Sequence, residues 1–97
     1  MSDVAAAIER LGERFLARAW DDLGDLKRWS ADPPQFAPEL RHLTHRLAGG
    51  AGTFGFHQLS TIAGDAEDAI LSATPDVRAR LDAVVRELER LTRDVHS

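Results

Sequence analysis

One histidine, His45, stands at the head of a run of small residues, with Gly49, Gly50, Ala51 and Gly52 following it. A neutral imidazole is a nucleophile near pH 7, because its unperturbed pKa is about 6.5. Each glycine inside a helix costs about 1 kcal/mol relative to alanine, so a glycine-rich helical stretch needs a compensating reason. Together these features indicate a nucleophile beside backbone that a partner can approach closely.

A helical wheel places the smallest residues of the stretch around His45. At about 100° per residue, Ala48, Gly49 and Gly52 lie about 60°, 40° and 20° from it, and Arg41 about 40° away on the preceding turn. We therefore expect the imidazole to be partly exposed beside a flat surface without large side chains. The alternative is that the glycines permit close helix packing and that the histidine is an ordinary surface residue; the wheel alone leaves both open.

Length and composition restrict the class of protein. Ninety-seven residues with 43% hydrophobic content predict one domain over 1–97 with a modest core. The absence of cysteine excludes disulfides and thiolate metal sites, and the net charge of −4 disfavours a nucleic-acid partner. We expect no membrane span and no secretory signal, and hence a cytoplasmic protein.

The apolar periodicity predicts an all-α chain. The expected helices cover residues 5–11, 15–29, 38–51, 56–70 and 77–95. Gly12 ends or bends the first, Pro33 and Pro34 mark the clearest break, and Thr74 is expected to cap the last. Four long helices with short connections predict an antiparallel up-and-down four-helix bundle, with an additional short N-terminal helix across one end. Trp20 and Trp29 are expected in its core.

The stretch His45–Phe56 resembles the signature of histidine-containing phosphotransfer (HPt) domains, His-x-Leu-Lys-Gly followed by small residues and glycine. It is most similar to the variant in the N-terminal HPt domain of chemotaxis histidine kinases, whose Gly-Gly-Ala-Gly-Thr-Phe-Gly-Phe run recurs without a gap at Gly49–Phe56. The resemblance implies a four-helix bundle in which His45 exchanges a phosphoryl group with a receiver-domain aspartate or a kinase. It implies a carrier that is not itself an enzyme and uses no cofactor, and we expect a monomer.

The resemblance also assigns roles to neighbouring residues. Glu67 matches a glutamate on the following helix that orients the histidine, while Gly49 and Gly52 match positions over which the receiver docks. The chain departs from the family at Ala48, where a lysine normally compensates the phosphoryl charge. Arg41 is then the first candidate for this compensation and Arg46 the second, with His42 flanking the docking face.

Other readings stay open at this stage. Glu39 and His42 form a Glu-x-x-His pattern typical of di-iron bundles, and His42 with His45 could share a metal, but the further ligands are missing from the sequence. A pure interaction bundle would follow if the tryptophans were exposed. The chain could also be a non-phosphorylated HPt-like module that binds receivers or kinases, or an excised domain of a chemotaxis-type kinase.

Overall fold

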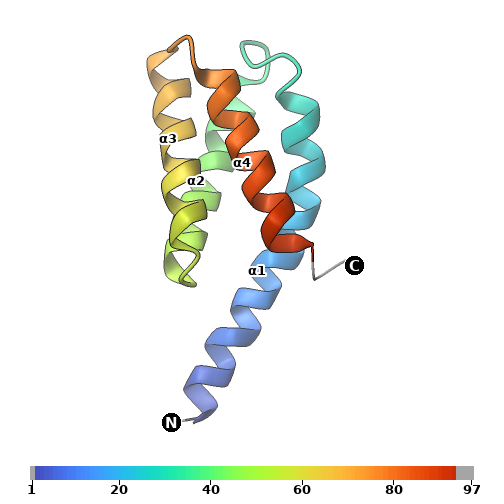
Figure 1. The fold of residues 1–97 in the computed structure, drawn as a ribbon, viewed down its shortest axis with the longest axis vertical. Helices are drawn as coiled ribbons and strands as arrows, with labels where there is room; N and C mark the ends of the chain where they lie inside the picture. The colour runs from blue at the N-terminus through green and yellow to red at the C-terminus, as the bar shows by residue number, and fades with distance from the viewer. Residues whose placement is uncertain (1, 94–97) are drawn as a thin grey trace.

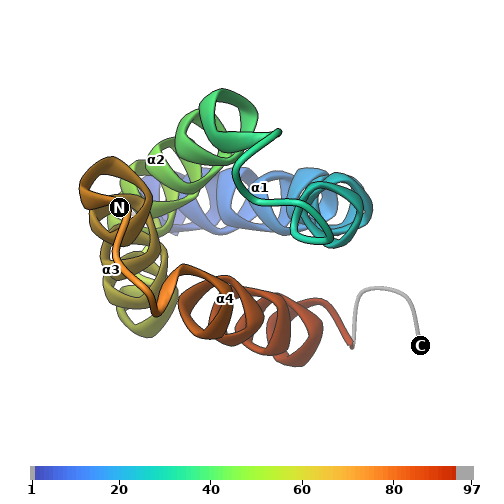
Figure 2. The ribbon, with the colours of Figure 1, turned by 90° about the horizontal axis from the view of Figure 1, so that it is seen from above.

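The computed structural model describes residues 2–93, which form four helices and no strand. The helices are α1 (Ser2–Trp29), α2 (Ala37–Thr53), α3 (His57–Ser72) and α4 (Val77–Thr92). They run alternately up and down (Figure 1). Each packs on the next, and α4 returns against α1, so that the bundle closes on itself (Figure 2). The predicted all-α antiparallel four-helix bundle is confirmed.

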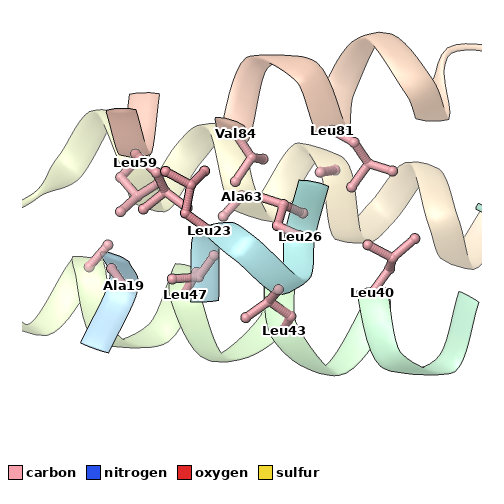
Figure 3. Close-up of a cluster of buried hydrophobic side chains, with 13 residues drawn as sticks. Ala19, Leu23, Leu26, Leu40, Leu43, Leu47, Leu59, Ala63, Leu81 and Val84 are labelled. Carbon is pink, nitrogen blue, oxygen red and sulfur yellow. The ribbon is translucent and has the colours of Figure 1, made fainter. Parts of the chain in front are cut away.

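One apolar face of every helix points into a shared core (Figure 3). Leucine dominates it, and the largest side chains that are fully buried include Leu26, Leu40, Leu43, Leu47, Leu59, Leu81 and Leu88. Alanines of α3 fill the remaining space, which lets α3 lie close to its neighbours. The core thereby fixes which face of α2 points outward, and this is the face that carries His45.

The prediction of an additional short N-terminal helix is wrong. The two segments on either side of Gly12 are one continuous helix of 28 residues. A single glycine lowers helix stability by only about 1 kcal/mol, and Gly12 faces the turn between α2 and α3, where a Cβ would lie 3.8 Å from the Cβ of Phe54. At 1.5 Å per residue α1 is about 42 Å long, so its N-terminal part projects beyond the other helices (Figure 1).

The ends of α2 follow from local backbone chemistry. The helix begins at Ala37, and Pro38 occupies its first turn, where a missing N–H costs little. It continues through Thr53, two residues past the last position predicted, and the connection to α3 consists of Phe54, Gly55 and Phe56. Gly55 has a φ of +85°, a left-handed conformation that glycine adopts without steric cost.

The start of α4 differs from the prediction. Asp76, rather than Thr74, is the residue at the N-cap, and Pro75 lies in the turn before the helix. The Thr74 hydroxyl instead donates a hydrogen bond to the Asp76 carboxylate. This carboxylate also accepts a bond from Arg80, and the two bonds lower the pKa of Asp76. The predicted last apolar position, Val95, lies outside the described residues.

The two tryptophans occupy different environments. Trp29 is half-buried and stacks on Phe36 at a centroid distance of 6.5 Å, against the core. Trp20 is 40% exposed, so its assignment to the core is wrong. None of the four helices described is long and apolar enough to cross a membrane.

Candidate functional site

His45 lies on the outer face of α2, and its side chain is 76% exposed. The buried residues Leu43, Thr44 and Leu47 hold this segment of the helix against the core, and the Thr44 hydroxyl donates to the carbonyl of Leu40. The imidazole is therefore supported by a fixed backbone while remaining accessible to a partner. This agrees with the exposure expected from the wheel.

Glu67 of α3 is the hydrogen-bond partner of His45. Its Oε2 lies 2.9 Å from Nδ1 of the imidazole, and its side chain is only 17% exposed. A carboxylate can only accept, so in a neutral imidazole this bond places the proton on Nδ1. Nε2 is then left with its lone pair, and the carboxylate on the opposite nitrogen stabilises positive charge that develops on the ring when Nε2 reacts.

The three glycines of α2 serve different purposes. A Cβ at Gly49 would meet no heavy atom within 4 Å, so this position is open surface one turn after His45. A Cβ at Gly52 would lie 3.3 Å from Oγ of Ser60, beside α3. A Cβ at Gly50 would lie 2.9 Å from Cδ1 of Phe15, inside the α1–α2 contact. Gly50 therefore serves packing, whereas Gly49 keeps the surface beside the imidazole flat.

The two arginines considered for charge compensation are separated by the fold. Arg41 lines a surface hollow of about 190 Å³ that also includes His45 and Glu67, with Pro38 and His42 completing its wall. Within residues 2–93 its guanidinium makes no ion pair. Among the described residues, Arg41 therefore provides an unpaired cation beside the imidazole, one turn before it.

Arg46 points instead to α1. Its guanidinium pairs with Asp22 at 2.9 Å, and the Asp22 side chain is 13% exposed. Asp22 was missed from the sequence, although it interrupts the apolar stripe of α1 that includes Phe15, Ala19 and Leu26. A carboxylate in such a stripe indicates that a cation from another helix faces it.

Ala48 takes the place of the family lysine on the α3 side of His45. It is half-buried against the core, and its carbonyl accepts a hydrogen bond of 2.9 Å from the hydroxyl of Ser60. Ser60 was also missed, because nothing in the sequence distinguishes it from an ordinary helix-surface serine. The alanine side chain itself provides no cation on this side of the imidazole.

The residues of the metal hypothesis, Glu39, His42 and His45, are divided between two surface hollows, and His42 lines both. Glu39 and His42 line a separate hollow between α1 and α2, with Trp29 and Leu43 in its wall. Among the residues that the structure describes, no group of three or more histidine, aspartate or glutamate side chains could hold a metal ion.

A family model described as the Hpt domain matches residues 10–96 of the chain. The chain belongs to the Hpt domain family. No curated protein and no solved structure matches the chain. An Hpt domain serves in histidine phosphotransfer within phosphorelays and interacts with response-regulator receiver domains or with kinases. In this Hpt domain, the exposed imidazole beside a carboxylate is the feature suited to that chemistry.

Proposed function

We propose that His45 is the phosphoacceptor of this Hpt domain, and that it exchanges the phosphoryl group with a receiver-domain aspartate. The single observation that carries the proposal is the pair of His45 Nδ1 and Glu67 Oε2 at 2.9 Å on an imidazole that is 76% exposed. The pair leaves Nε2 as the nucleophile, and the open surface at Gly49 lets a partner's active site reach it.

The transfer step needs no catalytic group from this chain other than the pair of His45 and Glu67. The Nε2 lone pair forms the N–P bond as the P–O bond to the receiver aspartate breaks, and the aspartate leaves as a carboxylate. Positive charge developing on the ring is stabilised by Glu67 through the Nδ1–H bond. The receiver supplies the metal and the in-line geometry, so we propose a phosphocarrier rather than an enzyme.

The test is transfer of label from receiver domains phosphorylated with radiolabelled acetyl phosphate, together with autophosphorylated sensor kinases of the same organism. Label should move to the full chain and be released by acid but not by alkali, as expected of a phosphoramidate. Absence of label from every receiver and kinase would contradict the proposal. Receiver binding without label would instead establish the non-phosphorylated module, for which the missing cation at Ala48 is the supporting observation.

The carboxylate of Glu67 provides a first prediction. Glu67→Gln should slow phosphorylation of His45 by about 10- to 100-fold, because a neutral amide stabilises the ring charge less and no longer fixes the tautomer. The measurement is the single-turnover rate of label transfer from a phosphorylated receiver. Asp68→Asn is the matched control, since it removes one exposed carboxylate from the next position of α3; equal rates for the two variants would remove Glu67 from the mechanism.

Arg41 provides a second prediction. We propose that its unpaired guanidinium compensates the phosphoryl charge of roughly −1.5 to −2 in place of the family lysine. Ala48→Lys should therefore change the lifetime of phospho-His45 or the transfer rate, and Arg41→Ala should slow transfer by about 10-fold, a loss that the added lysine should partly restore. If neither substitution changes the transfer rate or the lifetime, the partner alone supplies the positive charge that compensates the phosphoryl group.

A further inference from the structure

The projecting N-terminal part of α1 carries an exposed apolar stripe. Val4, Ile8 and Leu11 are 64%, 51% and 46% exposed, and their spacing of four and three residues places them on one face of the helix. The stripe continues the face that buries Ala19 and Leu26 further along α1. The stripe therefore resembles a core-facing surface, but this part of α1 projects beyond the helices that would cover it (Figure 1).

The stripe ends on an aromatic floor at the base of the bundle. The ring of Phe15 lies 5.9 Å from that of Phe54 and 5.7 Å from that of Phe56, and all three side chains are half-buried. Exposed apolar surface of this extent marks an interaction site more often than an isolated exposed side chain does. Val4 and Ile8 also lie outside residues 10–96, the part that the family model covers.

We propose that a second copy of this chain covers the stripe, with the two projecting segments packed antiparallel about a two-fold axis near Glu9 and Arg10. In this register Ile8 of each copy faces Leu11 of the other, and Val4 of each faces the aromatic floor at Phe15 of the other. Every apolar residue of the stripe then has an apolar partner, as the a and d positions of a coiled coil do.

The residues that flank the stripe favour this arrangement over a parallel one. Ala5 and Ala7 are small and permit close approach of the two helices. In the antiparallel register Asp3 of one copy lies near Arg14 of the other, an opposite-charge pair. A parallel register would separate Asp3 from the partner's Arg14 by about 16 Å along the helix axis, so this pair would not form.

The expected dimer is weak. Three exposed side chains and part of the aromatic floor fall short of the roughly 800 Å² per partner that stable interfaces bury, so monomer and dimer should interconvert in solution. His45 lies on a different surface from the stripe, eight residues before the end of α2. The proposed dimer therefore does not depend on phosphotransfer. It replaces the monomer expected from sequence with a concentration-dependent equilibrium.

Sedimentation velocity of the full chain from about 10 μM to 1 mM tests the equilibrium, the range in which an interface of this size associates. The mean mass should rise from monomer toward dimer, and Ile8→Glu should weaken association by at least about 10-fold. Leu71→Glu is the matched control, because Leu71 is 57% exposed on α3, away from the stripe. A wild-type chain that stays monomeric, as it would if a different protein covers the stripe, overturns the proposal, and so does equal weakening by both variants.

Engineered cysteines test the register independently of stability, since the chain has no cysteine of its own. Ile8→Cys protein and isotopically labelled Leu11→Cys protein are mixed and oxidised, and the disulfides are identified by mass. The antiparallel pair should enrich the mixed disulfide at least about five-fold over the two homodimers, because those positions face each other across the axis. Homodimers in excess, or a statistical mixture, would overturn the proposed pairing.

Discussion

Replacing His45 with glutamine is expected to abolish phosphorylation of the chain, lowering label from a phosphorylated receiver by at least about 100-fold. Glutamine keeps the length and polarity of the side chain but has no lone pair on nitrogen that can form an N–P bond. The substituted side chain is exposed and helix-compatible, so the bundle should keep its thermal unfolding midpoint. Quantitative gel autoradiography with parallel circular dichroism measures both.

His42 is the matched control for this experiment. It lies one turn before His45 on the same helix, is exposed, and lines the same hollow. The structure pairs Glu67 with His45, and His42 has no such partner among the described residues. His42→Gln should therefore retain acid-labile label. If label is lost with His42→Gln and kept with His45→Gln, then His42 is the phosphoacceptor and the prediction is wrong.

The parts of the site that lie on one helix could be predicted from sequence. The relation of His45 to Arg41, Ala48 and Gly49 depends only on helical periodicity, and the apolar pattern of α2 set which face is outward. The pairing of His45 with Glu67 could not be predicted from helical periodicity alone, because periodicity within α2 or α3 does not determine how the two helices pack against each other. The family motif supplied it, and the 2.9 Å contact agrees.

Predictions that depended on contacts between helices fared less well. Arg46 was considered for charge compensation, yet Asp22 of α1 lies 2.9 Å away and holds it. Gly12 suggested the end of a short helix or a bend in it, yet α1 continues through Gly12, which lies against the turn between α2 and α3. Trp20 has the spacing of a core residue, but its face of α1 is not fully covered. In each case the decisive neighbour is distant in the sequence, and a local pattern cannot place it.

The glycine run shows why both readings of its composition were incomplete. Close packing and partner approach were weighed as alternatives for the run as a whole. The structure divides the two roles between adjacent residues, since Gly49 faces open space and Gly50 faces the ring of Phe15. A wheel drawn around His45 cannot separate them, because the position of α1 decides which glycine is crowded.

Alanine at these two positions should therefore have opposite effects on stability. Gly49→Ala should raise the free energy of unfolding by about 0.5–1 kcal/mol, the ordinary helical preference for alanine. Gly50→Ala gains the same preference, but its Cβ would lie 2.9 Å from Cδ1 of Phe15, a ring held between Phe54 and Phe56. Overpacking of this kind costs about 1–3 kcal/mol, so the net result should be a loss of up to about 2 kcal/mol.

Urea unfolding followed by circular dichroism measures both glycine variants, and Phe15→Leu tests the assigned cause. The smaller leucine has no ring at the position that the new methyl group would occupy. Gly50→Ala should therefore be less harmful in the Phe15→Leu background than in the wild type, a coupling that a double-mutant cycle resolves. Equal stabilisation by Gly49→Ala and Gly50→Ala would show that Phe15 moves aside freely, and that the glycine at position 50 is not required for α1 to pack on α2.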